Sequence, residues 1–236
     1  MTTVTEIADK LYRLSTPVPP EVIPGGFTFN QFLLVDDAPL LFHTGPRKLF
    51  PLVKDAVARV IDPATLRWIS FSHYEADECG SLNDWLALAP QAEPLCGMTA
   101  AMVSVNDTAS RPARALADGE EVVLGAKRVR WLDAPHVPHN WETGFLFEAS
   151  TRTLLCGDLF THGGADLPAL TESEVLGPAI ATHQMGMSGF QPGPHTRAAL
   201  EKLARTEPGT LALMHGSSYK GDGGRLLREL ATALGV

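Results

Sequence analysis

A short acidic segment that directly follows an apolar stretch constrains this chain more than any other feature. The residues LRWISFS read as a strand, and the residues HYEADECG that follow bring His73, Glu75, Asp77 and Glu78 close together. Carboxylates at this spacing cannot all stay ionised at low cost unless a cation lies between them. In an extended segment residues two apart point the same way, so we expect His73, Glu75 and Asp77 to project to one side, with Glu78 turning in beside them. A solvated acidic loop that caps the next helix is the plainer alternative, but it explains neither the histidine nor the groups below.

Two further polar residues stand at the same kind of position. Asp158 follows LLCG and His215 follows LALM, so each comes just after an apolar strand, as His73 does. Loops at strand ends are where functional groups collect. We therefore expect Asp158 and His215 to join His73 in one site.

Strands mixed with helices, some of them in hairpins, predict a sheet covered by helices. Hairpins are expected in EEVVLGAKRVRWLDA, turning at Gly125, and in GFLFEASTRTLLCGD, turning near residues 150–152. A helix is expected to begin at Ser81 with its hydroxyl as the cap. Residues 16–26 are rich in proline and glycine and predict an irregular stretch. Without a repeat or a long linker, residues 1–236 are expected to form a single domain.

Composition excludes several classes of protein. The net charge of −8 disfavours a partner with a phosphate backbone, so no nucleic acid is expected. No apolar run approaches the roughly 20 residues that cross a bilayer, so no membrane is expected. The odd number and wide spacing of the three cysteines argue against a disulfide framework or a CxxC redox pair, which favours a cytoplasmic location.

The acidic segment also carries a family resemblance. HYEADECGSLNDW resembles the H-x-E-x-D-H-x-G segment of flavodiiron proteins, which belong to the metallo-β-lactamase superfamily. Four further segments are similar to segments of that family and follow in the same order: FTFNQFLLVDD, DAPHVPHNWETGFLF, LLCGDLF and ALMHGSS. The resemblance implies the α+β class and a four-layer αββα sandwich.

The resemblance also implies a metal-ligand set. Carried over by position, one metal ion would be held by His73, Glu75, His139 and Asp158, and the other by Asp77, Asp158 and His215, with Asp158 bridging. Glu78 stands where the family usually has a histidine. Glu78 either ligates through an oxygen or swings away and leaves an open position. Acidic replacements at this place also occur in the related oxygen-binding di-iron proteins.

Several other histidines and two cysteines leave alternatives open. His136 competes with His139 as the third histidine, but the spacing from His139 to GFLF matches the family, so His136 is expected to orient a ligand instead. His43 and His162 either reach the site or have no role in it, with their hydrogen-bond partners elsewhere. Cys79 and Cys156 are redox thiols or, as is commoner, small buried hydrophobes.

The donor set predicts iron, with zinc and manganese as alternatives. Imidazoles mixed with carboxylate oxygens suit iron or manganese better than zinc, and Glu75 in place of an imidazole adds negative charge that favours the ferric state. Asp77 and Glu78 are the expected catalytic groups.

The expected function is that of a non-haem di-iron protein that binds dioxygen, peroxide or nitric oxide. Reduction of the bound molecule is part of this expectation if electrons are supplied. The chain ends at Val236 without room for a flavodoxin-like domain, so a separate electron-donor protein is expected. One alternative is an oxygen or iron sensor without turnover. The other is a metal-dependent hydrolase. In it, a metal-bound hydroxide would attack a small-molecule substrate, and Asp77 would orient that hydroxide. The sequence leaves open whether the chain forms a homodimer.

Overall fold

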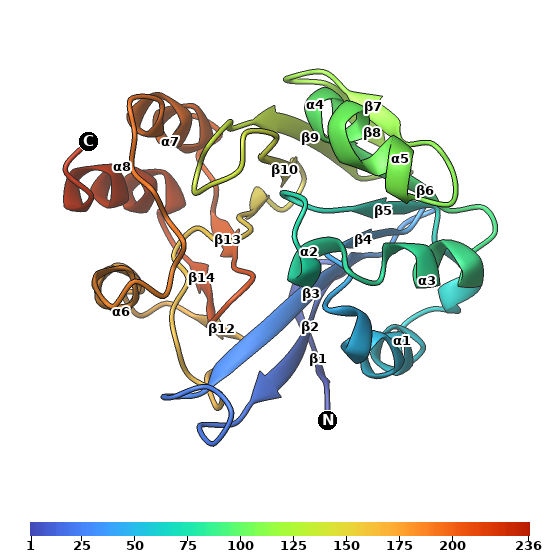
Figure 1. The fold of residues 1–236 in the computed structure, drawn as a ribbon, viewed down its shortest axis with the longest axis horizontal. Helices are drawn as coiled ribbons and strands as arrows, with labels where there is room; N and C mark the ends of the chain where they lie inside the picture. Colours follow the sequence, from blue (N-terminus) through green and yellow to red (C-terminus); the bar gives the residue numbers. More distant parts are fainter.

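The computed structural model describes all 236 residues and contains two seven-stranded sheets (Figure 1). The first sheet has the strand order β1 (Thr3–Ala8), β2 (Leu11–Val18), β3 (Phe27–Leu34), β4 (Leu40–Phe42), β5 (Trp68–Ser70), β6 (Glu93–Gly97), β7 (Arg114–Leu116). The second has the order β12 (Leu170–Thr171), β14 (Ser218–Lys220), β13 (Thr210–Ala212), β11 (Thr153–Leu155), β10 (Gly144–Glu148), β9 (Arg128–Asp133), β8 (Glu121–Val123).

Helices connect the strands and cover the sheets. They are α1 (Phe50–Val57), α2 (Ala76–Cys79), α3 (Leu82–Leu88), α4 (Met98–Ala100), α5 (Asn106–Thr108), α6 (Leu176–Gln184), α7 (Thr196–Ala204) and α8 (Gly223–Ala233). Three short turns of other helical types complete the list: η1 (Arg47–Leu49), η2 (Pro63–Thr65) and η3 (Ala101–Val105). None of these helices is both long and apolar enough to cross a membrane.

Strand pairing in both sheets combines hairpins with parallel crossovers. Strands β1 to β4 pair antiparallel, and β4 to β7 pair parallel through connections that contain helices. Strands β8 to β11 pair antiparallel, and β11 then pairs parallel with β13. Strands β11 and β13 are parallel neighbours, so their carboxyl ends lie side by side.

The side-chain alternation along the strands explains the layers. In β3 and β4, Phe32 and Leu40 face a core shared with Trp131 and Leu155 of the other sheet, whereas Leu33 points to the opposite face. That opposite face packs against α1 and α3, and the outer face of the second sheet packs against α6, α7 and α8 (Figure 1). Each fully buried side chain of this size contributes about 1.5–3 kcal/mol. The predicted four-layer αββα sandwich is therefore confirmed.

Most expected elements are present, but the N-terminal hairpin of β1 and β2 was not predicted. Residues 16–18, expected to be irregular, belong to β2. Buried Arg13 and Ser15 interrupt the polar–apolar alternation of this strand, which hides its signal in the sequence. Helix α3 does follow Ser81, but the expected hydroxyl cap is wrong, because Ser81 Oγ donates instead to Thr44 O at 2.8 Å.

The expected extended course of the acidic segment is also wrong. Glu75 is extended, but Asp77 and Glu78 lie in the single helical turn of α2. The turn rotates successive side chains by about 100°, so Glu78 becomes fully buried while Asp77 stays partly exposed. The acidic residues still face one region, but they reach it by a helical turn and not by strand alternation.

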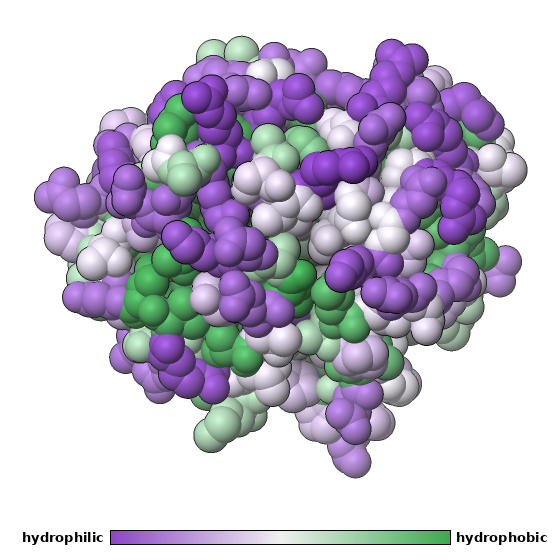
Figure 2. All heavy atoms as spheres, turned by 180° about the vertical axis from the view of Figure 1, so that it is seen from behind, coloured by the Kyte–Doolittle hydropathy of each residue, from purple (hydrophilic) through white to green (hydrophobic).

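The surface behind the view of Figure 1 is dominated by hydrophilic residues, with several separate apolar patches between them (Figure 2). Exposed large apolar side chains include Met98, Met102, Trp141, Met185 and Met187. Scattered apolar side chains are normal for a protein surface.

A buried carboxylate in the β10–β11 turn is expected to stabilise the fold. Glu148 is fully buried and accepts hydrogen bonds from Ser150 N at 2.8 Å, Ser150 Oγ at 2.6 Å and Thr151 N at 2.9 Å. Burial raises the pKa of Glu148, but these hydrogen bonds outweigh it and lower the pKa below its usual value. The carboxylate therefore adds stability above the ordinary glutamate pKa, and this stability is lost as the pH falls through the lower folded value.

We predict that Glu148→Gln lowers the free energy of unfolding at pH 7 by about 2 kcal/mol, measured by urea titration. The difference from the native chain should shrink below about pH 4. The control is Glu121→Gln, which alters an exposed pair with Arg128 and should change stability by less than about 1 kcal/mol. Equal losses in both variants would contradict the role of the turn.

Candidate metal centre

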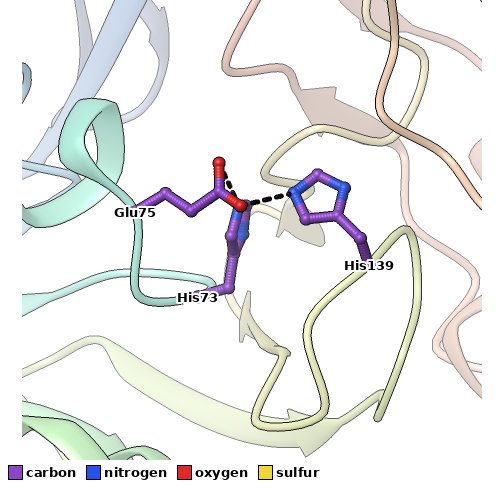
Figure 3. Close-up of side chains that lie close together, drawn as sticks. All are labelled: His73, Glu75 and His139. Atoms are coloured by element: carbon purple, nitrogen blue, oxygen red, sulfur yellow. Dashed lines mark hydrogen bonds and ion pairs between the residues drawn. The ribbon is translucent and has the colours of Figure 1, made fainter.

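Three side chains from two distant parts of the chain converge at one side of the centre (Figure 3). His73 lies three residues past the end of β5, Glu75 precedes α2, and His139 comes from the loop between β9 and β10. His139 Nε2 lies 2.9 Å from His73 Nε2 and 3.4 Å from Glu75 Oε1. Ligand atoms of these three residues lie within 4.8 Å of one another, which is close enough for one metal ion.

A second group lies beside the first. His215, three residues past the end of β13, has its Nε2 3.4 Å from Asp77 Oδ2. Its other ring nitrogen, Nδ1, donates to the carbonyl of Thr28 at 2.8 Å, which directs Nε2 into the centre. Ligand atoms of Asp77, Glu78 and His215 also lie within 4.8 Å of one another.

Asp158 lies between the two groups. Its Oδ2 is 3.6 Å from the Nε2 atoms of both His73 and His139, and its Oδ1 is 3.3 Å from His215 Nε2. Each oxygen therefore faces a different group, which is the arrangement that a carboxylate shared by two metal ions requires. Asp158 lies three residues past the end of β11, so the second sheet supplies both Asp158 and His215, while His73 follows a strand of the first.

Glu78 provides the test of whether these residues suit a metal ion. The side chain is fully buried, and neither carboxylate oxygen has a hydrogen-bond partner. Its Oε2 lies 3.7 Å from His73 Nε2. A buried carboxylate without a partner carries a large cost, and it is normally paired or bound to a metal. The open oxygens of Glu78 therefore fit a cation placed among the ligand atoms.

The charges of the centre shift the pKa of its members strongly. Burial raises the pKa of Glu78 well above its usual range, and the nearby Asp158 and Asp77 raise it further. Burial would also raise the pKa of Asp158, but His215, His73 and His139 lower it below its usual value. Burial would lower the pKa of His215, whereas Asp158 and Asp77 raise it to about 9. Opposed shifts within one buried cluster are typical of functional sites.

The seven residues expected as ligands thus meet in one cluster: His73, Glu75, Asp77, Glu78, His139, Asp158 and His215. His139, rather than His136, faces His73. The exposed His136 instead stacks on His195 with ring centroids 6.1 Å apart, and no hydrogen bond joins its side chain to the cluster. The structure therefore does not support an orienting role for His136.

His162 has a structural partner on each ring nitrogen. Its Nδ1 donates to Phe160 O at 2.9 Å, and its Nε2 accepts from Ser217 N at 3.0 Å. The ring lies against Gly216, where a Cβ would come within 2.3 Å of it. His162 thus connects the loop after β11 to the loop that carries His215.

Both cysteines that flank expected ligands are packed as small apolar side chains. Cys79 belongs to the core beneath α1 and α3, and Cys156 belongs to the core beneath α7 and α8. Burial raises the pKa of both thiols, which disfavours the thiolate that redox chemistry needs.

Some contributing residues carried no clear signal in the sequence. Asn140 donates its Nδ2 to Glu75 Oε1 at 3.3 Å, and the backbone of Thr28 holds His215. Phe27 and Phe29 pack on the His215 ring with centroids 4.3 and 5.5 Å away. The position of Asn140 directly after His139 is a signal that the sequence offers. The contribution of Thr28 comes from its backbone carbonyl, which every residue has, so the sequence cannot indicate it.

A cavity of about 290 Å³ opens onto the centre. Glu75, Asp77, His139, Asp158 and His215 line its polar side, and Phe27, Phe29 and Met187 line its apolar side. A small molecule entering this cavity would meet the carboxylates and imidazoles directly.

Comparisons with known proteins agree with this architecture. The family model described as ODP family β-lactamase matches residues 27–216. A protein of Nostoc sp. that carries the name diflavin flavoprotein A 1 is 29% identical over 197 residues, covering 81% of this chain and 33% of its own length. The chain thus spans about a third of the length of the diflavin flavoproteins that it matches.

Solved structures show the same fold at low identity. Rubredoxin oxygen:oxidoreductase from Desulfovibrio gigas superposes with a TM-score of 0.83 at 19% identity, covering 98% of this chain and 62% of the other. A metal-soaked flavodiiron core from Synechocystis sp. superposes with a TM-score of 0.82 at 20% identity, covering 99% of this chain and 61% of the other.

Glu78→Gln is predicted to stabilise the metal-free protein while weakening metal binding. With the folded pKa of Glu78 raised, ionisation opposes folding increasingly as the pH rises above the ordinary glutamate pKa. The free energy of unfolding of metal-free Glu78→Gln should therefore exceed the native value by about 1–3 kcal/mol at pH 7, with little difference near pH 4.5.

The measurement is urea unfolding of chelator-treated proteins at both pH values. Glu93→Gln, which alters a partly exposed pair with Arg67, is the control and should show no such pH trend. A metal-free Glu78→Gln protein less stable than the native chain at pH 7 would mean that the carboxylate has a favourable partner without metal.

Proposed function

Because this chain belongs to the ODP β-lactamase family, we propose that it holds two iron ions in this centre and binds dioxygen there. With an electron donor present, the proposed reaction is reduction of the bound gas. The observation that carries the proposal is the buried pair of carboxylates, in which Glu78 faces His73 and Asp158 faces His73, His139 and His215.

The donor atoms favour iron over zinc. The cluster offers three imidazoles and four carboxylates, and no thiol joins it, because Cys79 Sγ points to Glu75 O at 3.1 Å. Hard oxygen donors mixed with imidazole suit iron and manganese, whereas structural zinc sites favour nitrogen and sulfur. Each added carboxylate also stabilises the higher oxidation state by electrostatics.

We assign the residues to two ions that share Asp158. His73, Glu75 and His139 would hold the first, and Asp77, Glu78 and His215 would hold the second. When bound as a ferrous pair, iron would supply an open coordination face and two electrons for a diatomic gas.

The protein's own groups orient the ligands and shield them. Thr28 and Asn140 hold His215 and Glu75 through hydrogen bonds, so these side chains need little rearrangement to bind an ion. Phe27 and Phe29 cover the His215 ring and limit the access of water from that side. The cavity beside them admits a molecule as small as dioxygen.

We propose that residues 1–236 act as one di-iron domain that receives electrons from a separate one-electron carrier protein. The name of one sequence relative, rubredoxin-oxygen oxidoreductase, pairs rubredoxin with oxygen, which supports a small redox protein as the class of donor. A hydrolase with a metal-activated water would use the same cavity, so the experiment must separate the two.

The test starts with protein produced with ample iron and purified without air. We expect about two irons per chain and a new visible absorption band when the ferrous protein meets oxygen. Asp158→Asn should lose most of both ions because it contacts both groups, while Asp118→Asn, a partly exposed residue paired with Lys202, should keep them.

Three other outcomes are informative. Zinc in the purified protein together with rapid hydrolysis of a panel of esters and thioesters would overturn the di-iron proposal in favour of a hydrolase. Continued oxygen consumption with a reduced rubredoxin-type donor would establish a reductase. One stoichiometric oxidation without turnover would establish a binding protein.

A further inference from the structure

His43 is a fully buried histidine near the centre that contacts none of the expected ligands directly. It follows β4 and adopts a left-handed backbone with φ 65°. Its ring packs on Phe42 with the centroids 4.3 Å apart. A left-handed backbone is uncommon for a residue other than glycine, although histidine adopts it more often than most.

The hydrogen bonds of His43 define its tautomer. Ser72 N lies 3.3 Å from His43 Nε2, and a backbone N–H can only donate. His43 Nε2 is therefore an acceptor, and the ring proton of the neutral imidazole sits on Nδ1. Nδ1 faces the weak acceptor Met214 Sδ at 2.9 Å. Burial lowers the pKa of His43 to about 3, in agreement with a neutral ring.

The Ser72 hydroxyl lies between the rings of His43 and His73, so the tautomer of His43 bears on the tautomer of His73. Ser72 Oγ lies 3.0 Å from His43 Nε2 and 2.9 Å from His73 Nδ1. A hydroxyl has one proton, and we assign it to His43 Nε2, whose lone pair it shares with the longer contact from Ser72 N–H. Ser72 Oγ is then left as an acceptor, so the proton of the His73 ring must sit on Nδ1. A His43 ring with its proton on Nε2 instead would leave the buried Ser72 N–H facing another N–H.

We propose that His43 is a positioning residue that acts through the Ser72 hydroxyl to hold His73 in the Nδ1–H tautomer, with the Nε2 lone pair directed at the metal centre. The inference rests on the proposed metal site but concerns the metal-free chain as well. His73 Nε2 is the atom that faces Glu75, Glu78 and Asp158.

Ser72 alone could not impose this tautomer. Without an acceptor at His43, its hydroxyl proton could turn toward His73 Nδ1 and leave the ring proton on Nε2, where it blocks the metal. His43 also bridges the two sheets, because it follows β4 and contacts Met214, the residue before His215. Partners that fix a ligand histidine in this way typically contribute 10–100-fold to metal affinity.

The direct test is the tautomer of His73 in the metal-free protein, read from long-range ¹H–¹⁵N spectra. We expect Nδ1–H in the native chain and in His43→Gln, whose amide oxygen can still accept from Ser72. His43→Leu has a similar volume but no acceptor, and it should shift His73 toward Nε2–H.

Affinity for Zn²⁺, used as a redox-inert probe, should fall 10–100-fold in His43→Leu and less than about 3-fold in His43→Gln. Circular dichroism and thermal unfolding establish that each variant is folded. If His43→Leu does not fold, Ser72→Ala removes the same link with a smaller change and should give the same two effects.

A native His73 with its proton on Nε2 would overturn the inference. So would a folded His43→Leu protein that keeps both the Nδ1–H tautomer and native Zn²⁺ affinity. These results are distinguishable from failure of the proposed function. A native chain with the expected tautomer but no iron would defeat the di-iron proposal alone, whereas two bound irons with a tautomer that ignores His43 would defeat this inference alone.

Discussion

The structure depends on one constraint, which is the cost of burying carboxylates that have no partner. Glu78 has no exposed surface and no hydrogen bond to either oxygen, and Asp158 lies among three imidazoles beside it. Removing such groups from water costs several kcal/mol each unless opposite charge compensates them. The imidazoles compensate part of this charge, and the remaining imbalance is what a pair of cations would remove.

The sandwich provides the rigidity that such a site needs. His73, Asp158 and His215 each lie three residues past the end of a short buried strand, and the cores on both faces of each sheet hold those strand ends in place. The loops beyond the strands are joined to one another by His162 and Ser217, and by Asn140 and Glu75. Ligand atoms contributed by both sheets can therefore stay within a few ångströms without a bound ion.

Some features of this sequence determine structure more directly than others. Long apolar runs and hairpin turns predicted their elements correctly, since burial determines them. Local geometry was less predictable. The acidic segment forms the turn of α2 and not a strand, and this turn carries Glu78 into the interior while Asp77 stays partly exposed. Strand β2 was missed because Arg13 and Ser15 are buried in it against the usual pattern.

The sequence by itself determined the chemistry: three histidines and four carboxylates, placed after apolar strands in an order that resembles one family, predict the sandwich and the composition of the metal centre. Only the tertiary structure decided how these residues meet. It placed His139 rather than His136 opposite His73, buried Glu78 without a partner, and connected His43 to His73 through one hydroxyl. The physical reason is that residue type and strand position are local properties, whereas contacts between loops of two sheets depend on how the sheets pack together.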